Sequence, residues 1–203
     1  MRPVVALVRH EARLLASLAR WVARRPDGVG GADVLGVFGH ARDQAAYMYG
    51  FAFVCAVETV GMACLLAPWP VVHQVFLVLD VYTVLFVLGL HAASATRPHV
   101  LTRDALRVRQ AGHVDVVIPL ERIASVRHEL LFSHPKEEGA LQLAVASQTS
   151  VTIELAEPVT AVRLLGGRYP VRTVRCHADD ARALVAAVRR ARTALSPGPG
   201  RPG

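Results

Sequence analysis

The chain has 203 residues, of which 53% are hydrophobic, and its 23 basic residues outnumber its 16 acidic ones to give a formal net charge of +7. This hydrophobic fraction is higher than a soluble domain usually carries. Cys55, Cys64 and Cys176 show neither CxxC spacing nor a zinc signature, so we expect no metal site and no cofactor. The length allows one membrane hairpin and one domain of about 100 residues.

Residues 1–25 are expected to form a basic amphipathic helix. At about 100° per residue, its arginines fall within roughly a 60° arc opposite leucines and valines. Such a helix can lie in the membrane interface with its arginines towards anionic head groups. Alternatively, it can pack on the cytoplasmic domain or on another copy of itself, and both alternatives stay open. Residues 26–44, with the turn-rich run PDGVGGAD, are expected to be a linker and pre-membrane segment. The arginines on the arc are Arg2, Arg9, Arg13, Arg20 and Arg24.

Two apolar segments follow, at residues 45–67 and 70–95, and no Lys or Arg occurs between Arg42 and Arg97. A hydrocarbon core of about 30 Å needs roughly 20 apolar residues in a helix. We therefore predict a transmembrane hairpin over residues 45–95. Basic residues flank it on both sides, so the positive-inside rule predicts a multi-pass protein of the cell (inner) membrane with both termini in the cytoplasm.

Four ionisable residues lie within the predicted spans. Glu58 and Asp80 both fall about 14 Å below the outer turn at 1.5 Å per residue, and His73 and His91 share a helix face with Asp80. Polar groups at this depth are costly when they face lipid. Three interpretations are open: a proton or ion site, a dock for a basic residue of a partner's transmembrane helix, and a hydrogen-bonded packing device.

After Pro98 the pattern changes to period two, which indicates short antiparallel strands. Asp179 or Asp180 is expected to cap a final helix that ends near Leu195. The stretch 157–170 is expected to be a long loop, and the Pro/Gly tail at 196–203 to be disordered. About seven strands are predicted: His99–Thr102, Ala105–Gln110, His113–Pro119, Ile123–Leu131, Leu141–Ala146, Val151–Leu155 and Val171–His177.

Two runs in this region carry a resemblance. Residues 97–127, RPHVLTRDALRVRQAGHVDVVIPLERIASVR, resemble the opening of bacterial pleckstrin-homology-like (PH-like) domains, with x-L-T-x-D-x-L-x-V followed by I-P-L-x-x-I-x-x-V. Residues 171–191, VRTVRCHADDARALVAAVRRA, resemble their last strand and helix. Over roughly residues 45–195, the chain resembles small, uncharacterised two-span integral membrane proteins of actinomycete-type bacteria. This resemblance implies a PH-like domain at 97–195 and brings no catalytic motif.

Four arginines follow the second span closely, where anionic head groups are near: Arg97, Arg103, Arg107 and Arg109. Head-group contact is one interpretation, and ordinary solvated charge is the other. The chain has no nucleic-acid-binding motif, so we expect no nucleic-acid partner.

The sequence also lacks a nucleophile–base pair and metal-ligand spacing. We therefore expect a non-enzymatic membrane protein whose PH-like domain binds a protein partner, another copy of itself or the membrane surface. The alternative is an accessory or oligomeric subunit of a transporter or envelope sensor that uses Glu58 and Asp80.

Overall fold

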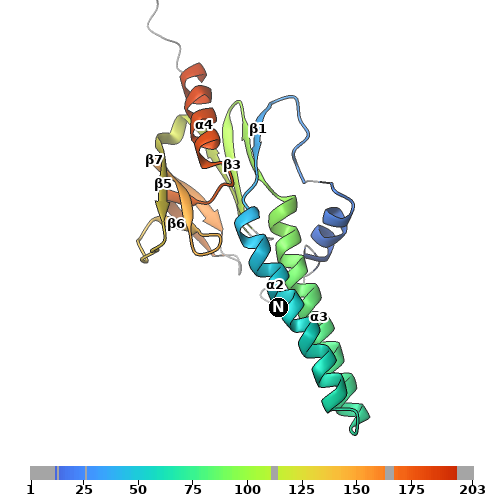
Figure 1. Ribbon diagram of the computed structural model, residues 1–203. Helices are drawn as coiled ribbons and strands as arrows, with labels where there is room; N and C mark the ends of the chain where they lie inside the picture. The colour runs from blue at the N-terminus through green and yellow to red at the C-terminus, as the bar shows by residue number, and fades with distance from the viewer. Residues whose placement is uncertain (1–11, 13, 26, 111–113, 163–166, 196–203) are drawn as a thin grey trace, which may run out of the picture.

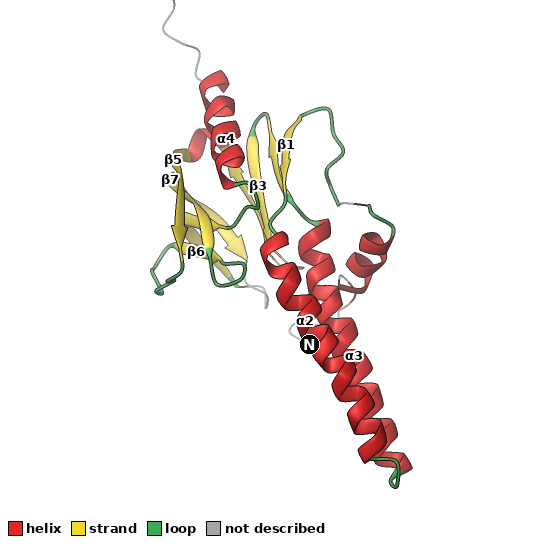
Figure 2. Cartoon of the chain, in the orientation of Figure 1, coloured by secondary structure: helices red, strands yellow, loops and turns green. Residues whose placement is uncertain are grey.

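The computed structural model describes residues 12, 14–25, 27–110, 114–162 and 167–195. Two long helices project together from an α+β domain of two four-stranded sheets, with another helix at the opposite end of the molecule (Figure 1). A shorter helix at 14–22 lies beside the pair near the sheets (Figure 2). The predicted architecture of a helical hairpin plus an α+β domain is confirmed. The predictions for Arg2, Arg9, Arg13 and the tail at 196–203 lie outside the described residues.

The hairpin consists of α2 (Arg42–Leu65) and α3 (Pro70–Thr96). Its bounds differ by at most three residues from the predicted segments. Pro70 can begin α3 because the first helical position needs no amide donor. Both helices are long and apolar enough to cross a membrane, and only 6% and 22% of their most apolar stretches are buried. That exposure distinguishes them from the core helices of a soluble protein.

One face of α2 packs on α3. The hydroxyl of Thr59 on this face donates a 2.8 Å hydrogen bond to the carbonyl of Cys55, so it is satisfied within its own helix. Beyond Tyr49, the other sides of α2 are mostly exposed. The packed face shows a helical period, with buried or half-buried side chains at Met48, Ala52, Cys55, Thr59, Met62 and Leu66.

The first sheet has the order β1-β2-β3-β4 and is antiparallel throughout. Its last three strands match the predicted positions closely. Alternating burial along β4 places Val114, Val116 and Ile118 in the core and Asp115 and Val117 outside. The strands are β1 (Val34–Phe38), β2 (His99–Thr102), β3 (Ala105–Gln110) and β4 (Val114–Pro119).

Strand β1 corrects the expectation that residues 26–44 only link and lead into the first span. Residues Val34–Phe38 pair with β2, with Phe38 opposite His99. The run VLGVF has no polar residue to mark an alternating pattern, although burial does alternate along it. The α+β domain is therefore discontinuous in sequence, with one strand before the hairpin and the rest after it.

The second sheet has the order β5-β7-β8-β6, and it corrects the expectation of about seven antiparallel strands. With β1 included, the described residues form eight strands, and β6 runs parallel to β8. Strand β8 lies between β6 and β7, although β6 and β7 follow one another in the chain. The strands are β5 (Ile123–Leu131), β6 (Ala140–Leu143), β7 (Thr149–Val162) and β8 (Arg168–Cys176).

The expected long loop at 157–170 is instead largely strand. Strand β7 bends at a register shift between Glu154 and Val159, and pairing with β8 then resumes with Val159 opposite Val171. Pro158 sits within this shift, where a residue that cannot donate to the ladder is tolerated. Within the described residues, 157–162 and 168–170 are therefore strand and not loop.

Helix α4 (Ala181–Leu195) confirms the predicted C-terminal helix. Asp180 is its cap, since Oδ1 accepts a 2.9 Å hydrogen bond from the amide of Ala183. Leu184, Val188 and Ala191 on one face of α4 join the core formed by the two sheets. A short turn, η1 (Leu120–Arg122), joins β4 to β5 and packs beneath α4.

Candidate functional site

The two acids predicted to lie within the membrane, Glu58 and Asp80, do not form a bonded pair. Glu58 is exposed on α2, and Asp80 is half-buried on α3. Oδ2 of Asp80 is shielded and has no hydrogen-bond partner in the described part of the chain. His73 is half-buried near the start of α3. Neither an ion pair nor a hydrogen bond links Glu58, Asp80 and His73 within the described ranges.

His91 has a different environment from the other three. It is buried near the end of α3, with Nε2 3.3 Å from the hydroxyl oxygen of Tyr49 on α2. The ring of Trp21 packs edge-on against His91 with centroids 5.7 Å apart. Leu14 packs over Gly89, where an added Cβ would lie 3.4 Å from the Leu14 Cβ. The helix at 14–22 is therefore packed on the hairpin, which is a different surface from the cytoplasmic domain or second copy that the packing alternative named.

Three of the predicted head-group arginines surround carboxylates instead of standing free. Arg107 binds Asp115 through two hydrogen bonds, from Nε at 2.6 Å and from Nη2 at 2.5 Å. Arg97 bridges Asp115 at 3.2 Å and Asp27 at 3.6 Å. Arg109 is only 1% exposed; its Nη1 donates to the Asp27 carbonyl at 2.8 Å and its Nε lies 3.9 Å from Asp115. We call these five residues the arginine cluster.

The arginine cluster shifts the pKa values of Arg107 and Arg109 in opposite directions. The hydrogen bonds to Asp115 raise the pKa of Arg107 above its ordinary value. Desolvation lowers the pKa of the buried Arg109, and the nearby charge of Arg107 lowers it further. Asp115 is the carboxylate shared by all three arginines, so the cluster depends on it.

The other predicted arginines within the described residues, Arg20, Arg24 and Arg103, lie on the surface. Arg20 is 3.5 Å from Asp27, and Arg103 is 3.9 Å from Asp33, in both cases between exposed side chains. Arg24 is exposed at the end of the helix at 14–22 and lines a groove with Trp21. Head-group contact by these three arginines stays a prediction.

A buried histidine junction, which the sequence analysis did not find, lies where the hairpin joins the sheets. Only residues 39–41 separate β1 from α2, and only residues 97–98 separate α3 from β2. His40 in the first connection and His99 at the start of β2 stack with ring centroids 4.6 Å apart. His177, at the end of β8, completes the group, and all three rings are buried. We call His40, His99 and His177 the histidine junction.

Hydrogen bonds fix the protonation state of His99. Its Nε2 donates to the His177 carbonyl at 2.9 Å, while its Nδ1 accepts from the Arg109 amide at 3.1 Å. This arrangement requires the neutral ring. Burial lowers the pKa of His99 to about 4. Burial, together with the nearby His99 and His177, lowers the pKa of His40 to about 3. These two rings are therefore neutral structural groups near pH 7.

The connection between β8 and α4 holds the start of α2. Oδ1 of Asp179 accepts a 3.1 Å hydrogen bond from the amide of Arg42, which caps α2 from a distant part of the chain. The amide of Asp179 donates to the Gly39 carbonyl at 2.8 Å. Asp43 in the first turn of α2 lies 3.3 Å from Nε2 of His177. No signal in the spacing of these residues could have predicted this contact.

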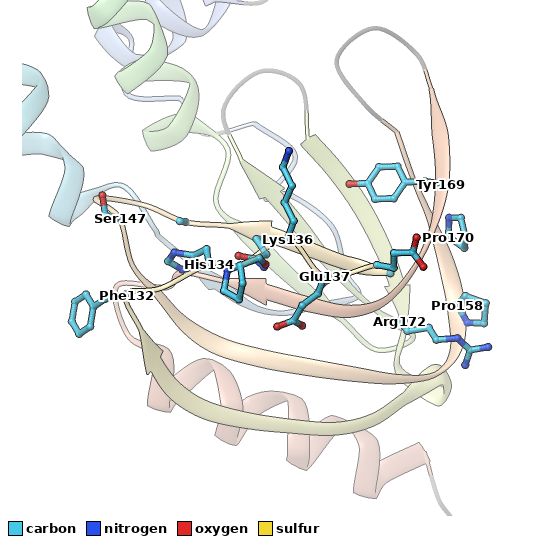
Figure 3. Close-up of a pocket in the computed structure, with 15 residues that line it drawn as sticks. Phe132, His134, Lys136, Glu137, Ser147, Pro158, Tyr169, Pro170 and Arg172 are labelled. Atoms are coloured by element: carbon cyan, nitrogen blue, oxygen red, sulfur yellow. The ribbon is translucent and has the colours of Figure 1, made fainter.

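An open groove of about 1330 Å³ crosses the outer face of the second sheet. Phe132, His134 and Lys136 from the β5–β6 connection line one side, and Tyr169 and Arg172 from β8 line the other (Figure 3). The side chain of Phe132 is 68% exposed. The connection is held in place by an ion pair of 3.1 Å between Glu137 and Arg175 and by a hydrogen bond of 2.6 Å from Gln142 to the Pro135 carbonyl.

The groove offers aromatic rings, prolines and charges of both signs, which suits recognition of a protein segment. Within the ranges that the structure describes, no three His, Cys, Asp or Glu side chains are grouped to hold a metal ion. No protein-family model, curated protein or solved structure matches this chain.

Proposed function

We propose that this chain is a two-span protein of the cell (inner) membrane that presents a PH-like interaction domain to the cytoplasm. The observation that carries the proposal is the direct continuation of both hairpin helices into paired strands, through residues 39–41 and 97–98. This continuity holds the domain in a set orientation against the membrane. The basic flanks of the hairpin support cytoplasmic placement of both termini.

The PH-like part of the proposal rests on the resemblance of residues 97–127 and 171–191, and on the architecture. Two sheets enclose a common core, and α4 covers one end of it. The parallel pairing of β6 with β8 departs from a simple antiparallel order. A PH-like domain with a rearranged edge accounts for both observations.

The groove beside β8 is the proposed interaction surface, and a protein segment is its proposed occupant. Lys136 and Arg172 are exposed there without an ion-pair partner in the described part of the chain, while Phe132 and Tyr169 offer ring surface. Aromatic residues and arginine are enriched in protein interfaces. The function is therefore binding, without catalysis and without nucleic acid.

Photo-crosslinking in living cells tests this proposal. A photoreactive amino acid in place of Phe132 in the full chain should give one discrete protein adduct, because the groove is occupied. The same group in place of the exposed Ala194 on α4 should give none. Adducts with lipid alone would assign the groove to the membrane surface.

A topology reporter fused after residue 203 tests the proposed orientation. An extracellular signal from this reporter would contradict the cytoplasmic placement of the C-terminus.

The envelope-sensor alternative gains support from the histidine junction. Connections of only three and two residues would pass a change in the hairpin directly to the sheets. Asp80, whose Oδ2 is shielded without a partner, is then the natural origin of such a change. If the hairpin controls the groove, Asp80→Asn should alter the crosslinking yield at residue 132 while the amount of inserted protein stays constant. An unchanged yield would leave the simple anchor as the better account.

A further inference from the structure

One face of α2 lies uncovered within the apolar part of the hairpin. Gly50, Val54, Val57, Gly61 and Leu65 are all exposed, and their spacing of three and four residues places them on one side of the helix. A Cβ added at Gly50 or at Gly61 would meet no atom within 4 Å. We call these five residues the glycine face.

Glu58 stands at the edge of the glycine face, about two turns below its outer end at Leu65. Its side chain is exposed, and no residue in the described ranges gives it a hydrogen bond or an ion pair. The hairpin supplies no Lys or Arg that could reach it. A carboxyl group that faces lipid at this depth is costly, and such groups normally face another helix or a watery cavity.

We propose that a second copy of this chain covers the glycine face, with two parallel α2 helices related by a twofold axis and their Glu58 side chains hydrogen-bonded to each other. A twofold axis along the membrane normal brings the same residue of both copies to the same depth. A protonated carboxyl donates one hydrogen bond and still accepts others. Two carboxyl groups that share a proton therefore satisfy one another without a basic residue.

The two glycines explain why α2, and not α3, forms this contact. Glycines let transmembrane backbones approach closely, which brings short polar side chains into reach. Gly50 and Gly61 are open, whereas Gly89 on α3 is already covered by Leu14. The exposed side of α3 carries bulky residues instead, among them Val71, Val75, Val78, Leu79 and Tyr82.

A native cysteine allows a direct test in membranes with the full chain. Cys64 is exposed one turn beyond Gly61, whereas Cys55 and Cys176 are buried. A short bismaleimide should therefore crosslink two copies through Cys64. Gly61→Leu should lower the yield roughly tenfold, as expected for the loss of close helix packing in a membrane. Ala56→Leu, at an exposed position on another side of α2, is the matched control and should crosslink like the wild type.

Variants of Glu58 identify the occupant. Glu58→Leu should also lose crosslinking roughly tenfold, whereas Glu58→Gln should keep it, because two amides also hydrogen-bond to each other. Loss in both variants would indicate a basic residue of another protein and would overturn the proposal. Wild-type yield in Glu58→Leu would overturn it as well.

A second readout avoids dependence on the cysteine. Two copies of the Cys64→Ser chain that carry different affinity tags should co-purify from detergent-solubilised membranes, and the Glu58→Leu versions should not. Failure of the Glu58-containing copies to co-purify would overturn the proposal even if Cys64 crosslinks.

Discussion

Lowering the pH from 7 to 5 should reduce the free energy of unfolding of the α+β domain by about 4 kcal/mol through His40 and His99 alone. Burial lowers the pKa of His40 from 6.5 to about 3 and that of His99 to about 4, so the folded protein keeps both rings neutral. The unfolded chain binds protons below about pH 6.5. The stability is thus complete above that pH and is lost as the pH falls towards the folded pKa, at about 2 kcal/mol per ring by pH 5.

Urea titrations of the full chain in detergent micelles, followed by circular dichroism, measure this effect. His40→Leu removes one of the two titrating rings and keeps the site apolar, so about half of the loss between pH 7 and pH 5 should disappear. If His40→Leu and the wild type lost the same free energy over this range, the buried neutral histidines would not be its source.

Asp115→Asn should destabilise the α+β domain by about 3 kcal/mol, the lower end of what the loss of one partner in a buried ion pair costs. Asp115 neutralises the Arg109 side chain, which is 2% exposed, and also Arg97 and Arg107. Without the carboxylate, these three guanidinium groups repel one another, and Asp27 remains as the only acid of the cluster. The same urea titrations, at pH 7, give the free energy change.

Asp33→Asn is the matched control for Asp115→Asn. Asp33 and Arg103 also form an ion pair next to β2, at 3.9 Å, but both side chains are largely exposed. Surface pairs contribute roughly 0–1 kcal/mol. A second comparison uses the double variant Asp115→Asn with Arg109→Met. Arg109→Met removes the buried guanidinium charge that Asp115→Asn leaves unpaired, so the double variant should recover part of the stability. Equal effects of Asp115→Asn and Asp33→Asn would contradict the assignment.

Strong local signals predicted most of the elements. The two long charge-poor segments gave the hairpin, and Asp180 with the spaced Leu184 and Val188 gave α4. Strands β2, β3 and β5 were also predicted because turn residues bound each of them. Prediction failed where pairing partners decide the structure: β1 is a strand because β2 lies beside it, and the second half of β7 is a strand because β8 continues along it.

The contact between Arg109 and Asp115 in the arginine cluster could not be predicted, because it depends on the register between β3 and β4. A two-residue turn at Ala111-Gly112 would place Gln110 opposite residue 113, but Gln110 is opposite Val114. A shift of one residue moves every side chain to the other face of a strand. Only the observed register places Arg109 opposite Asp115.

The histidine junction had no local signal at all. His40, His99 and His177 come from three distant parts of the chain, and each one stands beside an element end with ordinary neighbours. Their contact follows from the return of β8 to the base of the hairpin, which is a property of the tertiary fold. The environment of Glu58 was partly predictable: its depth follows from sequence, but its exposure depends on which face of α2 packs on α3.

In the proposed two-span arrangement, the short connections at 39–41 and 97–98 would couple membrane thickness to the direction in which the groove points. Transmembrane helices respond to a thinner or thicker bilayer by changing their tilt. A hairpin on flexible tethers would tilt without moving its domain. Here each helix runs into one of two hydrogen-bonded strands, and Asp179 holds the start of α2. Tilting the hairpin therefore rotates the domain with it, and the position of Phe132 relative to the membrane surface follows the bilayer.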